Sequence, residues 1–419
     1  MINTKKKPKI RGALKIFLNK KKLQHEDKIK YLGITIDRRF NFNQHIGNIT
    51  AKCIKIIHTL SNSAKINCGL RHDVLRIIYT GAILPILSYV ASVRIEGLKR
   101  NHNATKLKRV QRLTNIRIAT AYRTTSHEAG CVLTGITPIL IELGSLANIY
   151  HNARGNTQIG LYDAPKVYSK LNHPADAIEL KKCEGREYTI EIYTDGSKSS
   201  SGVRSGIAIF VNKHLTLQLM YKLAEECSNN QAEQLATVKA LEKLQDFRHL
   251  QEGQRSACIH TDSKITLDAT ANPTNQQNLV EQIREEVRRL EMENWTIHFT
   301  WVKAHNNNFG NELADQLAKK AASRREGETA YSKNPKNAVI KVIQREGQLE
   351  WQKERNASTK EEITNLFFSV IGDRKEKILQ MGIKTSTLLT GHGTLRSYFH
   401  RFKIIDSPEW LCKMGPQTT

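Results

Sequence analysis

The spacing of apolar and polar residues changes several times along the chain. Short alternating runs such as "KIKYLGITID" predict strands near the start, and apolar residues at helical spacing follow up to about residue 150. Strands then alternate with helices, and a polar linker leads into a last helical stretch. The pattern predicts five segments: 1–46, 47–165, 166–187, 188–325 and 326–419.

The segment 188–325 carries five strand-like runs: "YTIEIYT", "SGIAIFV", "LTLQLMYKL", "SACIHT" and "WTIHFTWVKA". Amphipathic helices lie between and after them, so we predict an α/β domain with a mixed five-stranded sheet and flanking helices. Asp195 and Asp262 are predicted to end two of the strands. Glu233 and Asp315 are predicted in the first turns of two helices, with Ser228 as the N-cap before Glu233.

A half-buried strand that ends on Asp195 has two interpretations. Asp195 and Gly196 could form a hairpin turn. Alternatively, the four acids could converge where strands of a mixed α/β sheet end, which is where such sheets form their sites. Converging carboxylates repel one another unless a divalent cation is bound, and oxygen ligands favour Mg²⁺ or Mn²⁺ over zinc. Two such ions about 4 Å apart can hydrolyse a phosphodiester.

The net charge of +25 is concentrated in one part of the chain. Residues 1–150 hold 27 Lys and Arg against 7 Asp and Glu, whereas residues 188–325 hold 17 of each. A basic helical region of this kind predicts a polyanionic partner, most simply the phosphate backbone of RNA or DNA. The alternative is a solvated lysine-rich surface.

No segment predicts secretion or membrane insertion. The longest apolar run, 81–93, is short and contains Pro85, so we interpret it as a core helix. The start of the sequence is basic without an apolar stretch, and the seven cysteines are scattered without close pairs. We therefore expect free thiols in a reducing, intracellular location, the nucleus or the cytoplasm.

Four motifs in the order "YTDGS", "NNQAEQLA", "IHTDSK" and "WVKAHNNNFGNELADQLA" resemble the ribonuclease H family over residues 188–325. The resemblance implies hydrolysis of the RNA strand of RNA–DNA hybrids with two Mg²⁺ ions, for which Mn²⁺ can substitute. It implies that Asp195 bridges both metals, that Glu233 and Asp262 bind one, and that Asp315 completes the other.

The same resemblance implies roles for residues around the four acids. His305 matches a histidine that assists proton transfer or product release, although a surface loop histidine is the simpler alternative. Ser228, Asn229 and Asn230 match positions that contact the hybrid. Lys264, a predicted substrate contact, stands where the family often has glutamine, and this departure bears on discrimination between the two strands rather than on the metals.

Residues 28–150 resemble the carboxy-terminal part of a reverse transcriptase from a non-LTR retrotransposon, with "AYRTTSHEA" as the most specific stretch. The resemblance implies that 1–46 is a remnant of the palm edge and that 47–165 is a thumb-like or connection-like helical region. A polymerase palm needs adjacent aspartates, and the sequence contains no Asp-Asp pair. We therefore expect no polymerase activity.

The last segment resembles the region after the nuclease in related elements, where a zinc motif is common. Only Cys412 of the expected pair is present, and His392 and His400 are too few to complete four ligands, so we expect no zinc. The alternative to an active nuclease is a catalytically silent, nucleic-acid-binding remnant of a retrotransposon. The sequence leaves the oligomeric state open.

Overall fold

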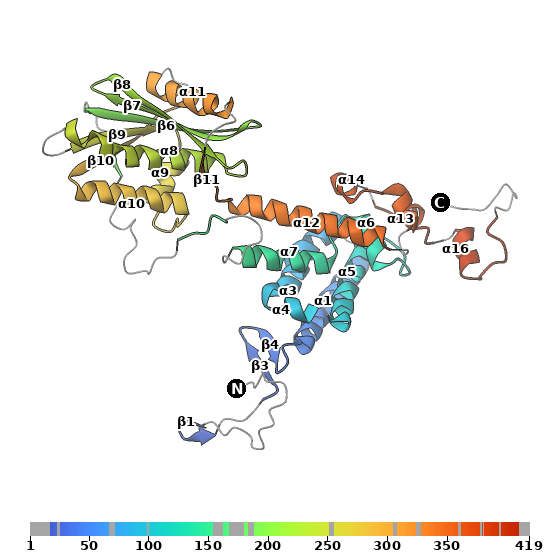
Figure 1. Cartoon of the computed structure of the whole chain (residues 1–419). Coiled ribbons are helices and arrows are strands. Elements are labelled where there is room, and N and C mark those ends of the chain that lie inside the picture. Colours follow the sequence, from blue (N-terminus) through green and yellow to red (C-terminus); the bar gives the residue numbers. More distant parts are fainter. Residues whose placement is uncertain are drawn as a thin grey trace. The chain divides into compact units, whose positions relative to one another are not determined.

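The computed structural model describes most of the chain in two units. The described residues are 17–22, 26–66, 72–98, 100–153, 162–166, 180–182, 188–250, 255–304, 308–323, 328–358, 362–377, 379, 381–393 and 395–409. Contacts between residues divide the chain into unit 1, Met1–Tyr150 with Val342–Thr419, and unit 2, His151–Lys341. Each unit is described by itself (Figure 1).

Unit 2 is built on a mixed sheet in the order β11-β8-β7-β6-β9-β10-β5. The antiparallel ladder β6–β7–β8 adjoins the parallel strands β9 and β10, which are the five strands that the sequence predicts. The prediction of five strands is incomplete, because short edge strands add at both sides. The bounds are β5 Lys181–Lys182, β6 Ile190–Ser199, β7 Gly202–Val211, β8 His214–Leu223, β9 Arg255–Thr261, β10 Trp295–Trp301 and β11 Thr329–Tyr331.

Helices cover both faces of this sheet. The main core lies on the face of α8, α9 and α10, and a smaller cluster with Ala208, Phe210 and Leu317 lies under α11 on the other face (Figure 1). Alternation along β6 explains the division, since Ile190 and Ile192 point into the main core while Tyr193 packs against the smaller cluster. The bounds are α8 Asn229–Lys243, η3 Leu244–Leu250, α9 Lys264–Ala271, α10 Asn278–Met292 and α11 Phe309–Ser323.

Two glycines let helices approach this sheet closely. A Cβ on Gly196 of β6 would lie 2.4 Å from the backbone nitrogen of Glu233 in α8. A Cβ on Gly206 of β7 would lie 2.2 Å from the carbonyl oxygen of Ala314 in α11. Any larger side chain at either position would push the helix away from the strand.

Unit 1 is mostly helical, as the sequence predicts. Its largest cluster of apolar side chains joins the long helices α1 and α5 to the shorter ones, and the hairpin β3–β4 packs on it through Ile34. The bounds are β1 Phe17–Leu18, β2 Lys21–Lys22, β3 Lys28–Tyr31, β4 Ile34–Asp37, α1 Asn43–Ile66, α2 His72–Ile78, η1 Tyr79–Ile83, α3 Leu84–Ser88, α4 Ala91–Leu98, α5 Asn101–Ile118, α6 His127–Thr134 and α7 Ile139–Asn152.

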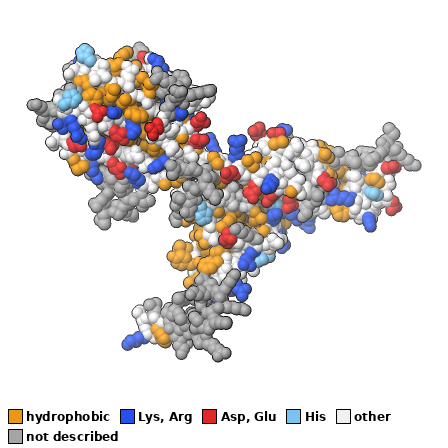
Figure 2. Space-filling view, in the orientation of Figure 1, with side chains coloured by type: hydrophobic (Ala, Val, Ile, Leu, Met, Phe, Trp, Pro, Cys, Tyr) orange, Lys and Arg blue, Asp and Glu red, His pale blue; other side chains and the backbone are white. Residues whose placement is uncertain are grey.

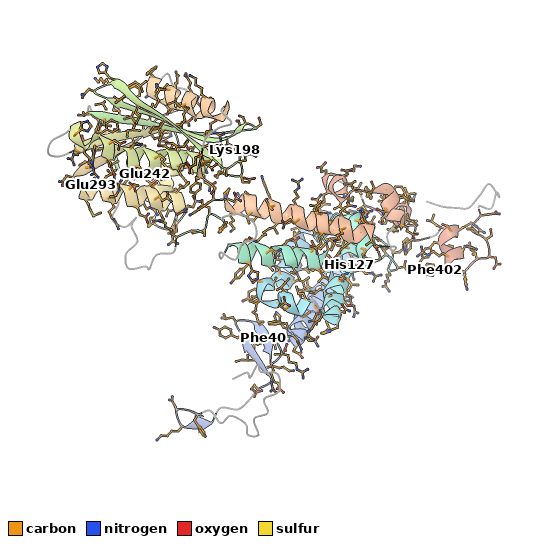
Figure 3. All side chains as sticks on the ribbon, viewed as in Figure 1. Phe40, His127, Lys198, Glu242, Glu293 and Phe402 are labelled. Carbon is orange, nitrogen blue, oxygen red and sulfur yellow. The ribbon has the colours of Figure 1, made fainter. Side chains whose placement is uncertain are left out.

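A buried polar network holds α5, α6 and the start of α7 together. The side chain of Gln111 donates to the hydroxyl of Tyr79 at 2.9 Å, and its oxygen accepts from the backbone of Ile139 at 2.8 Å. The same oxygen lies 2.8 Å from Nε2 of His127, which Figure 3 labels. Because each partner comes from a different helix, the network fixes their register.

Several of the helices that follow unit 2 in the chain pack on α6 and on the end of α5 rather than forming a separate tail. The guanidinium of Arg374 is buried and donates to the carbonyls of Val132, at 2.8 Å, and Leu133 at the end of α6. Ser386 donates to the carbonyl of Ala119. The bounds are α12 Lys336–Asn356, α13 Glu362–Phe367, α14 Ile371–Glu376, α15 Ile383–Thr390 and α16 Arg396–Arg401.

The structure differs from two expectations drawn from the sequence, one about the apolar run 81–93 and one about the cysteines. The apolar run 81–93 is not one core helix, because η1, α3 and α4 divide it and Val90 takes a positive φ of 53° between α3 and α4. Free thiols are found at Cys53, Cys131 and Cys227, but Cys258 is disulfide-bonded. Spacing along the sequence did not reveal that bond, because a disulfide depends on proximity in the fold.

Among the described residues, no single helix is long and apolar enough to cross a membrane. Two bent helix pairs, His72–Ser88 with Ala91–Leu98 and His127–Thr134 with Ile139–Asn152, pass the same test by length and composition.

We predict that Gly206→Ala lowers the free energy of unfolding by about 3 kcal/mol, because the new methyl group meets the backbone of α11. Gly144→Ala is the matched control, since a Cβ there meets nothing within 4 Å and alanine favours the helix by about 0.5–1 kcal/mol. Urea unfolding followed by circular dichroism measures both changes. Equal midpoints for Gly206→Ala and the unchanged chain would contradict the close-packing argument.

Candidate active site

Asp195 lies inside β6, at the point where the pairing of the strand changes. The parallel ladder with β9 ends at the pair Thr194 and Thr261, while the antiparallel ladder with β7 continues from Asp195–Gly206 to Ser199–Gly202. The predictions that Asp195 ends the strand or starts a hairpin turn are both wrong, because the turn comes after Ser199. The side chain of Asp195 is 7% exposed.

Asp262 comes directly after β9, as predicted. Since Thr194 of β6 and Thr261 of β9 are paired, the next residue on each strand, Asp195 and Asp262, reaches the same place on the sheet edge. The backbone around Asp262 is held by Trp301, whose indole N–H donates to the carbonyl of Asp262 at 3.0 Å. The position of this carboxylate is therefore set by strand register and by β10.

Glu233 is brought to the site by α8. Ser228 is the N-cap, as predicted, and forms a capping box with Gln231. Glu233 lies in the second turn of the helix rather than the first. Its carboxylate accepts a hydrogen bond from the amide of Asn229 at 2.7 Å and another from the hydroxyl of Ser263.

The loop before α8 is tied to the extended end of β6. Lys198, labelled in Figure 3, donates through its ammonium to the carbonyls of Glu225 at 3.1 Å and Cys227 at 2.5 Å. Gly196 lies between Asp195 and this anchor and contacts the backbone at Glu233. These contacts therefore hold the strand extension and the start of α8 together.

Asp315 approaches from the opposite face of the sheet on α11. It also lies in the second turn of its helix, so the predicted first-turn position is wrong for both helical acids. Its carboxylate pairs with the ammonium of Lys319, one turn further on, at 2.7 Å. Gly206 contacts Ala314 and is the strand partner of Asp195, which brings Asp315 next to Asp195.

All four carboxylates line one polar cavity of about 390 Å³. Burial raises the pKa of Asp195 to about 8, with further contributions from Asp262 and Asp315. Burial also raises the pKa of Glu233, against the lowering effect of the Ser263 hydroxyl. The cavity is lined by Asp195, Gly196, Asn229, Glu233, Asp262, Ala304, Asn311, Glu312, Asp315 and Lys319.

The donor set fits a divalent cation, since it consists of carboxylate oxygens that repel one another without a positive charge between them. Within the described ranges, no three His, Cys, Asp or Glu side chains are arranged as a ready metal site. The reason is local, because Glu233 is held by Asn229 and Ser263, and Asp315 by Lys319. Cation binding would require these contacts to rearrange.

Of the other predicted site residues that the structure describes, one lines the cavity and three do not. Asn229 lines it, and Asn230 and Lys264 are exposed at the starts of α8 and α9. Ser228 is half-buried and its hydroxyl caps α8. His305 lies outside the described residues, so its role stays a prediction.

Two residues that the sequence reasoning missed touch the acids directly. Lys319 could have been found, because it lies four residues after Asp315 on a predicted helix and such pairs face one another. Ser263 reads in the sequence as the N-cap of α9, and it fills that role with Thr266 as partner. Its contact with Glu233 depends on the distance between two helices, which the sequence does not show.

Comparison with known proteins agrees with this geometry. Residues 187–323 match the RNase H family model. A ribonuclease H from Pseudoalteromonas translucida is 30% identical over 148 residues, which are 32% of this chain and 91% of that protein. The chain belongs to the ribonuclease H family. Ribonucleases of this family hydrolyse phosphodiesters and generally depend on divalent metal ions.

The resemblance to retrotransposon proteins is also confirmed. The Retrovirus-related Pol polyprotein from type-1 retrotransposable element R1 4 of Nasonia vitripennis is 35% identical over 150 residues, 35% of this chain and 37% of the relative. The R1 2 polyprotein of the same species is 29% identical over 32% of this chain and 33% of its own length. The chain thus spans about a third of these curated relatives.

Solved structures with similar domains include the RNase H1 of Halobacterium salinarum, at 22% identity and a TM-score of 0.25, covering 32% of this chain and 96% of that one. LC11-RNase H1, solved in complex with an RNA/DNA hybrid, has 24% identity and a TM-score of 0.27 over 32% of this chain and 99% of its own.

The raised pKa of Asp195 predicts how metal-free stability depends on pH. The folded chain keeps a proton on Asp195 up to about pH 8, whereas the unfolded chain loses it near 3.8, so stability falls as pH rises through that window. Asp195→Asn removes this loss and should stabilise the chain at pH 8 in EDTA by about 1–3 kcal/mol. Thermal unfolding at pH 5 and pH 8 measures it.

Asp268→Asn, an exposed change on α9 away from the cavity, is the control and should leave the pH dependence unchanged. An Asp195→Asn protein whose stability falls with pH as steeply as that of the unchanged chain would contradict the electrostatic description of the site.

Proposed function

We propose that the chain hydrolyses the RNA strand of RNA–DNA hybrids with two divalent cations, Mg²⁺ or Mn²⁺, and that it does not polymerise DNA. The observation that carries the proposal is the cavity in which Asp195 of β6, Glu233 of α8, Asp315 of α11 and Asp262, directly after β9, meet. No single motif produces that convergence. The family membership supports the reaction class, and the carboxylate set supports the metals.

The four carboxylates are the proposed metal ligands. Bound divalent cations would lower the pKa of the attacking water and stabilise the leaving oxygen of the phosphodiester. Neighbouring side chains hold two of these ligands while no cation is bound. Asn229 and Ser263 donate to Glu233, and Lys319 pairs with Asp315, so cation binding would exchange these contacts for metal ligation.

The start of α8 is the proposed contact with the minor groove of the hybrid. Asn230 is exposed there, and Asn229 lines the cavity. Amide side chains can donate to and accept from the 2′-hydroxyl that marks RNA. His305, as a proton carrier or an aid to product release, and Lys264, as a phosphate contact at the start of α9, complete the proposed substrate side.

The grip on the nucleic acid is proposed to come from unit 1. The nuclease segment has equal numbers of acidic and basic residues, and Figure 2 shows both kinds mixed on its visible face. Residues 1–150 carry the excess positive charge. Arg109 on α5 is exposed, whereas Arg112 is used internally, since its guanidinium donates to the carbonyls of Thr125, at 2.7 Å, and Arg123.

A catalytically silent binding protein is the second candidate. The observation that favours it is that two of the four carboxylates are occupied by Asn229, Ser263 and Lys319, with no ready metal site among the described residues. The two candidates differ in one outcome, which is turnover. The absence of an Asp-Asp pair supports the lack of polymerase activity, and primer extension by the purified chain would contradict it.

Asp195→Asn is predicted to reduce cleavage of a labelled RNA–DNA hybrid in Mg²⁺ at least 100-fold, while binding of the hybrid persists, because the change removes a ligand and some repulsion. Asp268→Asn should cleave at the rate of the unchanged chain. Duplex RNA and EDTA serve as negative controls. Folded, hybrid-binding protein without any cleavage in Mg²⁺ or Mn²⁺ would favour the silent candidate.

Arg109→Glu is predicted to weaken hybrid binding and to flatten its dependence on salt by about one in the log–log slope, since one phosphate contact is lost. Lys353→Glu, an exposed change on α12, is the control for net charge alone. Fluorescence anisotropy in EDTA between about 50 and 200 mM salt measures both. If Arg109→Glu matches the control, α5 does not hold the nucleic acid.

A further inference from the structure

We propose that unit 1 carries a separate pocket for one unpaired nucleotide of single-stranded RNA or DNA. The pocket has a volume of about 580 Å³ and lies between α1, the hairpin β3–β4 and the end of α3. That size is within the range of small-ligand sites. Lys30, His45, Asn48, Lys52, Ile86 and Tyr89 are the lining residues on which the proposal rests.

A buried histidine in the wall of the pocket carries a hydrogen-bond donor that has no partner among the described residues. His45 is 3% exposed, and its Nδ1 accepts from the backbone N–H of Thr35 at 3.4 Å. Burial, with a smaller effect from Arg94, lowers the pKa of His45 to about 4, so the ring is neutral and carries its proton on Nε2. That nitrogen is buried without a partner in the described structure.

An unpaired buried donor lowers the stability of the free protein, and an acceptor on a ligand would remove that loss once the imidazole turns to present Nε2 to the cavity. The carbonyl oxygens and ring nitrogens of nucleobases are acceptors of this kind. Asn48 is exposed at the same pocket, one helical turn further along α1, and its amide can both donate and accept. The polar groups at this end of the pocket therefore suit the edge of a base.

Tyr89 supplies an aromatic surface beside these groups. It follows α3, its side chain is 50% exposed, and its hydroxyl donates to the carbonyl of Leu32 at 2.9 Å. That bond fixes the ring while leaving half of it open. Ile86 lies on the preceding turn, and Figure 2 shows hydrophobic side chains gathered on the surface around α3 and α4. Stacking of a base on such a ring is tolerant of sequence.

The charges around the pocket select an anion. Lys30 and Lys52 line it, and among the described residues no Asp or Glu does. A second cavity of about 380 Å³ shares Lys52 and continues along the same helix past Lys55 and Thr59. A strand whose base enters the first cavity can thus lay its next phosphates along α1, beside Lys52 and Lys55.

A nucleic acid fits these features better than a protein partner does. A peptide groove would be lined mainly by apolar side chains, whereas here an unused N–H donor, two ammonium groups and a fixed aromatic ring meet in one pocket. The proposal rests on the nucleic-acid grip proposed for unit 1, but it is independent of the nuclease reaction.

The test is binding of fluorescein-labelled 12-nucleotide oligo(dT) and oligo(U) to the full chain by anisotropy in EDTA, which prevents cleavage. Tyr89→Ala should weaken binding about tenfold through lost stacking, and Tyr89→Phe should keep binding within about twofold. Tyr31→Ala is the matched control, since Tyr31 is 61% exposed on β3 but does not line the pocket. It should bind as the unchanged chain does.

Lys52→Gln is a second variant on an exposed side chain, chosen because it does not alter the core. It should reduce the slope of log K against log salt by about 0.7, with Lys353→Gln as the charge-matched control. Oligo(dT) and oligo(U) distinguish a DNA from an RNA preference. The proposal of a nucleotide pocket would be overturned if Tyr89→Ala and Lys52→Gln bound the oligonucleotides as their controls do.

Hybrid cleavage in Mg²⁺, measured on the same preparations, separates this proposal from the nuclease. Full cleavage with weakened single-strand binding in Tyr89→Ala supports the pocket and shows that the protein is folded. If the unchanged chain cuts the hybrid but binds neither oligonucleotide, the pocket proposal is overturned and the nuclease proposal is supported. Normal, Tyr89-dependent binding without cleavage supports the pocket and counts against the nuclease.

Discussion

The close approach of α8 and α11 to the sheet is the constraint on which the nuclease unit depends. Gly196 faces α8 and Gly206 faces α11, and neither position has room for a Cβ. Because these glycines adjoin Asp195 in the strand and across the ladder, the helices come closest to the sheet where the acid is buried. The same contact that closes the core therefore forces Glu233 and Asp315 toward Asp195.

Bringing like charges together is unfavourable, and the fold compensates for it only in part. Ser263 and Asn229 donate to Glu233, and Lys319 neutralises Asp315, but Asp195 is buried among acids with a pKa raised to about 8. A group of this kind holds a proton near neutral pH unless a cation replaces it. The acids at this site therefore favour a bound cation, and they lower the stability of the unit when no cation is bound.

The sequence predicted the elements of the nuclease unit well because alternation and helical spacing report burial directly. It also found the four acids and the Ser228 cap, since acids next to buried strands and helix starts are visible one residue at a time. The sequence wrongly placed Asp195 at the end of a strand. At Asp195 the pairing of β6 with β9 has ended, but the pairing with β7 continues. Ser263 was missed for a related reason, since its contact is between helices.

Long-range packing in unit 1 was not visible in the sequence at all. The polar segments after residue 326 resemble a tail, yet Arg374 reaches 242 positions back to the carbonyl of Val132. The buried His45 was likewise hidden, because its pocket forms only when α3 and the hairpin β3–β4 pack beside it. Local pattern specifies elements, while sites that need three of them appear only in the fold.

The most direct test of the central claim is calorimetric titration of the metal-free chain with Mn²⁺ at pH 7 in two buffers of different ionisation enthalpy. Binding should release about one proton, because Asp195 must lose its proton to coordinate the ion. Both this release and most of the affinity should disappear in Asp195→Asn. Binding without proton release, or equal binding by the Asp195→Asn protein, would contradict it.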